Sequence, residues 1–180
     1  MKEKYVADIC GRKEELPIIA LSDSVKIAFF NLHGNVGLTE YCAQKLAEKL
    51  KDYEFDVVLT AESKGLQLSH CLARNLGHEF YAVARKSKKL YMQDGIESRV
   101  KSITTQNLQT MYLSAFDVCL LKGKRVAVVD DVISTGGSIS AMESLVEQAG
   151  ATVAVKAAVL AEGDAAKRGD IVYLAEIPLM

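Results

Sequence analysis

One short segment of the chain joins an apolar run, two acidic residues and a loop with two glycines. Residues 127–129 are apolar and predict a buried strand, and Asp130 and Asp131 follow them directly. The next residues lead into a predicted helix over residues 138–148. In open α/β sheets, ligands bind where the strands end at their carboxyl side, so the two aspartates are candidate ligand-binding residues.

The loop between this strand and the helix has the composition of an anion site. Two glycines allow the backbone to approach a ligand closely, and successive N–H groups at a helix N-terminus bind negative charge. Two carboxylates beside such a loop need a ligand that also donates hydrogen bonds, or a metal ion between them. A sugar phosphate meets both needs, whereas in the simpler alternative the residues only turn the chain. The loop residues are Val132, Ser134, Thr135, Gly136, Gly137 and Ser138.

The same order of strand, helix and strand recurs along the chain and predicts the fold class. Strands are expected at residues 25–30, 55–60, 80–84, 125–130, 152–160 and 171–174. Helices are expected from a cap at Thr39 to Leu50, from Gly65 to Leu76 with Gly77 as the stop, and over residues 138–148. This alternation predicts an α/β protein with an open, mostly parallel sheet flanked by helices.

Bulk properties narrow the classes of protein. The 180 residues and 49% hydrophobic content suit one domain over residues 1–180, and the net charge of −1 speaks against nucleic acid as the main partner. Four scattered cysteines predict neither a zinc site nor a disulfide framework. No apolar run is long enough to span a membrane, so we expect no membrane partner and a cytoplasmic location.

Two segments do not follow the α/β pattern. Residues 86–113 are polar and too long for an ordinary connection, which predicts a flexible flap over a binding site, with a plain surface hairpin as the alternative. Residues 1–35 contain short extended pieces and predict a small N-terminal hood.

The segment Val-Val-Asp-Asp-Val-Ile-Ser-Thr-Gly-Gly-Ser, residues 128–138, resembles the phosphoribosyl pyrophosphate signature of type I phosphoribosyltransferases. A broader resemblance runs from about Thr60 to the C-terminus and is closest to adenine phosphoribosyltransferases and related purine enzymes. It includes the segments 62–65 and 83–86, with Lys89-Leu90. We therefore expect the type I phosphoribosyltransferase fold, with the flap and hood described above.

The resemblance implies a role for each matching residue. Asp130 and Asp131 would bind the ribose 2- and 3-hydroxyls, and the loop over residues 132–138 would hold the 5-phosphate. Glu62, Ser63, Lys64 and Gly65 match the family's pyrophosphate loop, and Arg85 and Lys89 would add positive charge for the leaving group. The catalytic residues expected are Asp130, Asp131 and Arg85. Alone, segment 62–65 could equally be an ordinary helix start, and the basic run a solvated loop.

The expected reaction transfers the 5-phosphoribosyl group of phosphoribosyl pyrophosphate to a purine base, with adenine favoured over xanthine, guanine or hypoxanthine. The resemblance also implies Mg²⁺ carried largely by the donor's own oxygens near Asp130 or Asp131, with no protein metal ligand assigned, and a homodimer. Base recognition is expected from the hood around Arg12, with Leu160 and Glu162, although Arg12 could instead be a surface charge.

Two departures from the adenine pattern leave alternatives open. Lys64 stands where adenine enzymes have arginine, and their Glu-Tyr pair of the flap is missing, residues 102–110 lying in its place. The flap also resembles the purine-operon repressor, a non-catalytic sensor of phosphoribosyl pyrophosphate, but the region before Thr60 is too short for its DNA-binding domain. A dinucleotide-binding dehydrogenase is excluded because no Gly-x-Gly-x-x-Gly follows the first strand.

Overall fold

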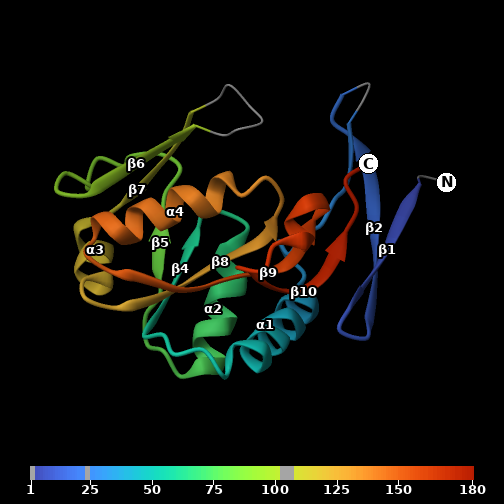
Figure 1. Ribbon diagram of the computed structural model, residues 1–180, viewed down its shortest axis with the longest axis horizontal. Helices are drawn as coiled ribbons and strands as arrows, with labels where there is room; N and C mark the ends of the chain where they lie inside the picture. Colours follow the sequence, from blue (N-terminus) through green and yellow to red (C-terminus); the bar gives the residue numbers. More distant parts are fainter. Residues whose placement is uncertain (1–2, 23–24, 102–107) are drawn as a thin grey trace.

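The computed structural model describes residues 3–22, 25–101 and 108–180 and is built around a five-stranded parallel sheet (Figure 1). The strand order is β10-β9-β8-β4-β5, and every neighbouring pair runs parallel. The predicted α/β fold with an open parallel sheet is confirmed. The strands are β4 (Val57–Ala61), β5 (Ala82–Ala84), β8 (Arg125–Ile133), β9 (Thr152–Glu162) and β10 (Val172–Ile177).

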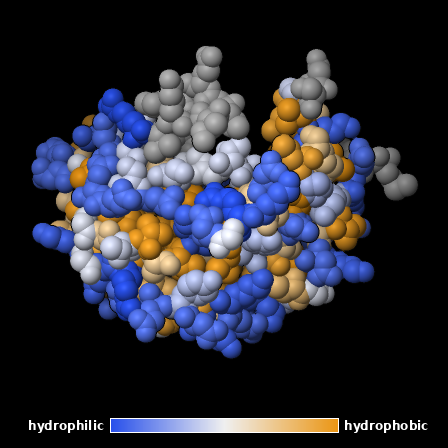
Figure 2. All heavy atoms as spheres, in the orientation of Figure 1, coloured by the Kyte–Doolittle hydropathy of each residue, from blue (hydrophilic) through white to orange (hydrophobic). Residues whose placement is uncertain are grey.

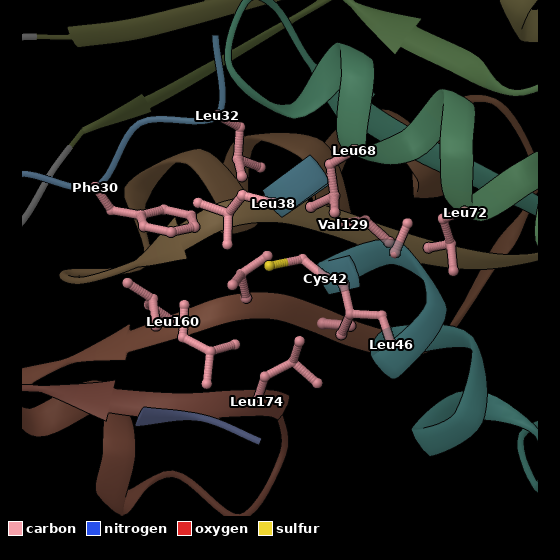
Figure 3. Packing of buried hydrophobic residues seen from close by; sticks show 14 of the residues in the cluster. Phe30, Leu32, Leu38, Cys42, Leu46, Leu68, Leu72, Val129, Leu160 and Leu174 are labelled. Carbon is pink, nitrogen blue, oxygen red and sulfur yellow. The ribbon is translucent and has the colours of Figure 1, made fainter. Parts of the chain in front are cut away.

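Helices cover both faces of this sheet because successive strand residues point to opposite sides. In β4, Val58 packs into a core cluster with α1 (Val36–Leu50) and α2 (Gly65–Leu76). Val57 and Leu59 pack into a second cluster with α4 (Gly137–Gln148). This two-sided burial explains why the strands read as continuous apolar runs. Figure 3 shows the first cluster closing around Cys42 and Leu46.

The start of α1 differs from the prediction, which placed the cap at Thr39. Asn35 is the cap, and its side-chain oxygen accepts a hydrogen bond from the N–H of Leu38 at 3.1 Å. Thr39 lies inside the helix, where its buried hydroxyl donates to the carbonyl of Asn35 at 2.7 Å. The end of α2 is as predicted, with Gly77 in the left-handed conformation at φ 74°. None of the described helices has both the length and the apolar character to cross a membrane.

Strand β8 is longer than predicted, and this changes the placement of the two aspartates. Pairing with β9 continues to Ile133 opposite Ala161, because β9 itself extends to Glu162. Asp131, predicted just after the strand, therefore belongs to the central strand together with Asp130. Consecutive strand residues face opposite sides of a sheet, yet both aspartates contribute to the lining of one cavity.

A separate antiparallel sheet forms most of the segment predicted as the hood. It consists of β1 (Lys4–Ile9), β2 (Arg12–Ala20) and β3 (Lys26–Ala28) and stands beside β10 (Figure 1). Ala7, Ile9 and Leu16 are buried in the first core cluster, and the N–H of Lys26 donates to the carbonyl of Met180 at 2.8 Å. Figure 2 shows apolar side chains gathered at the far end of β2, where Ile19 and Leu21 are exposed.

The segment predicted as the flap contains a two-stranded hairpin of β6 (Ile96–Lys101) and β7 (Leu108–Leu113). Residues 102–107, which fall within the predicted flap, lie outside the described residues. The hairpin is joined to the main sheet through reciprocal backbone hydrogen bonds of 2.8 Å between Arg85 and Tyr112. Two short helices were not predicted, α3 (Ala115–Leu121) and the 3-10 helix η1 (Gly163–Lys167).

The packing of α1 gives a test of the first core cluster. Leu46 has no exposed surface, so we expect Leu46→Ala to reduce the free energy of unfolding by about 2–5 kcal/mol through lost burial and the cavity left behind. Urea unfolding measures the change. Leu90→Ala is the control because Leu90 is 97% exposed, and it should change stability by about 0.5 kcal/mol or less. Equal effects of the two substitutions would contradict the assigned core.

Candidate active site

A cavity of about 420 Å³ opens where β4 and β8 end and the N-terminal sheet approaches the main body. Figure 2 shows the surface notched beside the N-terminal sheet. Six separate parts of the chain contribute to the cavity, and most of the predicted site residues are among them. The lining consists of Ile27, Ala28, Phe29 and Phe30 from the hood region, Ala61, Glu62, Ser63 and Lys64 from the last residue of β4 onward, Asp130, Asp131, Val132, Ser134 and Ser138 from β8 onward, and Lys86, Glu162 and Ile177.

The two aspartates form a coupled acidic pair in the cavity wall. Asp131 is only 6% exposed, and its N–H donates to Oδ1 of Asp130 at 2.9 Å. Burial, and then the charge of Asp131, raise the pKa of Asp130 to about 7. Lys64 supplies a nearby positive charge, its Nζ lying 3.5 Å from Oδ2 of Asp131. At neutral pH, Asp130 is therefore poised between its protonated and ionised forms.

The loop behind the aspartates has the shape of an anion site. Ser134, Thr135, Gly136, Gly137 and Ser138 line a hollow of about 110 Å³ that shares residues with the main cavity. Gly136 is the cap residue of α4 and adopts φ 82°, a left-handed conformation that favours glycine. The loop thus leads directly into the N-terminus of α4, whose backbone N–H groups and dipole favour negative charge.

The loop after β4 carries Glu62, whose side chain is held by the residues after β5. Both carboxylate oxygens of Glu62 are engaged, one by Nη1 of Arg85 at 3.0 Å and one by the N–H of Lys86 at 2.8 Å. Burial alone would raise the pKa of Glu62, but these hydrogen bonds lower it below its ordinary value. Glu62 therefore holds Arg85 and the backbone of Lys86 beside this loop, and its predicted role in donor binding stays a prediction.

Gly65 is required where α2 begins beside β4. A Cβ atom at this position would lie 2.1 Å from Oγ1 of Thr60 and 3.6 Å from Oδ1 of Asp130. A side chain there would push the loop away from the acidic pair. Lys64, just before it, lies with Nζ 5.0 Å from the ring centroid of Phe29 and so joins the loop after β4 to the N-terminal segment.

The basic residues after β5 are divided between cavity and surface. Lys86 lines the cavity, and Arg85 reaches it through its contact with Glu62, while Nη2 of Arg85 donates to the hydroxyl of Tyr91 at 3.2 Å. Lys89 instead donates to Oγ of Ser87 at 2.8 Å and is not part of the described cavity lining. Of the predicted basic run after Arg85, the structure therefore brings Lys86 into the cavity lining.

The three predicted base-binding residues have different positions. Glu162 lines the cavity. Leu160 is fully buried in the first core cluster, so only its backbone could serve a ligand (Figure 3). Arg12 is held elsewhere: Nε contacts Glu14 at 2.5 Å, Nη1 donates to the carbonyl of Gly37 at 3.1 Å, and the guanidinium lies 5.5 Å from the ring centroid of Tyr41. Arg12 is not among the described residues that line the cavity, and its predicted role in base binding stays a prediction.

The sequence analysis missed the apolar part of the cavity wall. Ile27, Phe29 and Phe30 come from the hood, and Ile177 comes from the end of β10. The two adjacent phenylalanines at the end of an apolar run, directly before a turn, were the signal that could have identified them. An aromatic ring in a cavity wall next to charged groups offers a flat surface for a planar ligand.

Comparisons with known proteins agree with this geometry. The family model described as phosphoribosyl transferase domain matches residues 34–175. An adenine phosphoribosyltransferase of Petrotoga mobilis is 34% identical over 116 residues, 64% of this chain and of the relative, so the chain spans slightly less than two thirds of that protein's length. A xanthine phosphoribosyltransferase of Exiguobacterium sp. is 37% identical over 137 residues, 74% of this chain and 69% of the relative.

The fold is shared with a solved enzyme as well. The structure of adenine phosphoribosyltransferase from Saccharomyces cerevisiae, complexed with an imino-altritol bisphosphate and adenine, matches with a TM-score of 0.67 at 23% identity, covering 88% of this chain and 92% of that one. The likeness at this identity shows the fold. Because the family model covers residues 34–175, including the strand end with the two aspartates and the glycine loop after it, the chain belongs to the phosphoribosyltransferase family.

Proposed function

We propose that this protein is a purine phosphoribosyltransferase that transfers the 5-phosphoribosyl group of phosphoribosyl pyrophosphate to a purine, with adenine as the favoured base. The observation that carries the proposal is the shared cavity. It joins an acidic pair, an anion-binding loop, a second loop with basic residues and an apolar wall within one space of about 420 Å³. These four surfaces correspond in chemistry to ribose hydroxyls, a 5-phosphate, a pyrophosphate and a planar base.

The donor would be held at three points. Asp130 and Asp131 would accept hydrogen bonds from the ribose 2- and 3-hydroxyls, and the backbone from Ser134 to Ser138 would hold the 5-phosphate at the start of α4. Lys64 and Lys86 line the cavity and would meet the pyrophosphate, together with Arg85 held by Glu62. In this arrangement the pyrophosphate of the donor would lie toward the basic residues, and its 5-phosphate would lie toward the loop before α4.

The reaction is a displacement at C1 of the ribose. A ring nitrogen of the base forms a bond to C1 while the bond from C1 to the pyrophosphate oxygen breaks, and that electron pair leaves with the pyrophosphate. The base nitrogen gives up its proton to the leaving pyrophosphate or to water, and positive charge develops on the sugar in the transition state. The protein's contribution is to align the reactants and stabilise the leaving anion, so no covalent nucleophile is needed. We propose that the N-terminal hood and the flap exclude water during this step.

Magnesium belongs to the proposal as a companion of the donor. Within the described residues, no group of three or more His, Cys, Asp or Glu side chains converges to hold a metal ion. A magnesium ion near Asp130 and Asp131 would thus take its ligands mainly from phosphoribosyl pyrophosphate and water. When bound, it would neutralise charge on the leaving pyrophosphate. A homodimer and a cytoplasmic location are also proposed, and the family membership is what supports them.

The choice of adenine rests on Glu162 and the apolar wall. Adenine carries an exocyclic amino group that donates hydrogen bonds, and the Glu162 carboxylate in the cavity lining accepts them. Xanthine presents oxygen acceptors at the corresponding edge, which a carboxylate repels. Phe29 and Phe30 supply ring surface for the base. Among the relatives, the one from P. mobilis and the yeast structure with bound adenine support this base, whereas the Exiguobacterium relative supports xanthine.

The central experiment measures pyrophosphate release with a panel of bases. With phosphoribosyl pyrophosphate and Mg²⁺ present, we expect turnover with adenine to exceed turnover with xanthine, guanine and hypoxanthine, while uracil and orotate give none. Preferred turnover of xanthine would move the assignment to that base. Donor binding without turnover of any base would contradict the enzyme and support a sensor.

Substitution of Glu162 tests the base contact. We expect Glu162→Gln to lower kcat/KM for adenine by about tenfold and to narrow the preference for adenine over hypoxanthine, because a charged acceptor is lost. The affinity for phosphoribosyl pyrophosphate should not change. Glu176→Gln is the matched control, since Glu176 is an exposed glutamate on the neighbouring strand β10. A normal preference in the Glu162 variant would remove that residue from base recognition.

The raised pKa of Asp130 makes donor binding depend on pH. Ribose hydroxyls donate to ionised carboxylates, so binding must displace the proton that Asp130 holds below pH 7. We expect donor affinity, measured by calorimetry, to rise as pH increases from about 5.5 to 7, by up to about tenfold per pH unit, and to level off above the pKa. Asp130→Asn removes this titrating group, so the variant reports the pH dependence of the donor alone. Identical pH profiles for both proteins would contradict the assignment.

A further inference from the structure

The phosphate loop lacks a charged partner of its own. Its side chains, from Ser134 to Ser138, are hydroxyls and glycines, and the acidic pair Asp130 and Asp131 directly precedes it. A phosphate monoester in this loop would gain from backbone N–H groups and the α4 dipole but would be repelled by the neighbouring carboxylates. A positive side chain beside the loop would offset that repulsion, and Lys64 contacts Asp131 at the main cavity instead.

Arg168 lies against this loop. Its Nη1 is 2.8 Å from the position that a Cβ atom would occupy at Gly136, the cap residue of α4. A side chain at position 136 would have to displace the guanidinium. The missing side chain of Gly136 therefore allows Arg168 to approach the loop backbone, in addition to permitting the left-handed conformation.

The guanidinium is held in place from one side only. Nε and Nη2 donate to the two oxygens of Asp170 at 2.9 and 2.8 Å, a two-point contact that fixes the plane of the group. Asp170 also accepts from Lys156 at 2.6 Å, and Lys156 in turn contacts Glu143 of α4 at 2.8 Å. The Arg168 and Lys156 hydrogen bonds hold the pKa of Asp170 well below its usual range, so the pair stays ionised.

One donor of Arg168 is left for a ligand. In the part of the chain that the structure describes, Nη1 makes no hydrogen bond, and it is the nitrogen that lies beside Gly136. The side chain retains 31% of its surface exposed. A buried or fully paired guanidinium could not serve an incoming anion, whereas this one is fixed, charged and partly exposed, with Nη1 beside Gly136.

We propose that Arg168 is a binding residue for the 5-phosphate of the ribosyl group, with Nη1 as the donor. The inference rests on the proposed function, because it adds a residue to the donor site described above. The loop sequence provides no positive charge. Arg168, which follows η1 and lies 30 positions after Ser138, would supply it. Sequence motifs of the loop alone could not reveal it.

Two probe ligands separate the phosphate loop from the pyrophosphate loop. Ribose 5-phosphate and inorganic pyrophosphate are titrated by calorimetry into the wild type, Arg168→Gln and Arg168→Lys. We expect Arg168→Gln to weaken ribose 5-phosphate binding by about tenfold and to leave pyrophosphate binding unchanged. Arg168→Lys should recover part of the loss, since it keeps the charge and loses the planar group. Arg74→Gln is the control, because Arg74 is an exposed arginine in the last turn of α2 that pairs with Glu40 of α1.

Each other outcome contradicts the inference. Unchanged ribose 5-phosphate affinity in Arg168→Gln, with normal binding by the wild type, removes Arg168 from the site and leaves the proposed function intact. Equal loss of both ligands together with a lower melting temperature indicates a structural role, and the Lys variant tests this by keeping the contact to Asp170. If the wild type binds neither ribose 5-phosphate nor phosphoribosyl pyrophosphate, the proposed function itself fails.

Discussion

Two adjacent carboxylates at the end of the central strand determine which groups the rest of the site must contain. Asp131 is buried, Asp130 is half-buried, and the two carboxylates repel each other, so the wall around them must supply positive charge, protons or hydrogen-bond donors. Lys64 approaches from the loop after β4, and the start of α4 lies just beyond. A ligand that brings hydroxyl groups to the carboxylates relieves their repulsion, which is why an acidic pair can bind a sugar phosphate.

The two loops that flank this pair are built on different principles. The loop before α4 relies on backbone geometry and on the absence of side chains at Gly136 and Gly137. The loop before α2 relies on side chains, since Glu62 fixes Arg85 and the N–H of Lys86 in one arrangement. A monoester phosphate suits a cradle of N–H groups, whereas a pyrophosphate with more charge needs mobile and fixed cations.

Sequence reasoning was reliable where local rules decide the structure. Gly77 ends α2, and the apolar runs became strands with both faces covered, because burial and backbone freedom act over a few residues. It located the residues around Asp130 that line the cavity, although their roles stay predictions. It could not place side chains that meet only through tertiary contacts, such as Arg12 over the ring of Tyr41 and Phe29 beside Lys64. Strand β8 extends past Asp130 because it pairs with β9, and β9 is longer than the sequence pattern of β9 indicated.

The position of the apolar wall has a consequence for how such a protein can change its substrate. Ile27, Phe29, Phe30 and Ile177 all lie outside residues 34–175, the region shared with the family. The hydrogen bond from the N–H of Lys26 to the carbonyl of Met180 joins the start of β3 to the last residue of the chain, close in sequence to these wall residues. Most of the apolar wall is thus encoded outside the stretch that carries Asp130, Asp131 and the glycine loop. Substitutions in those outer segments can therefore reshape the apolar lining of the cavity while the acidic pair and the loop stay unchanged.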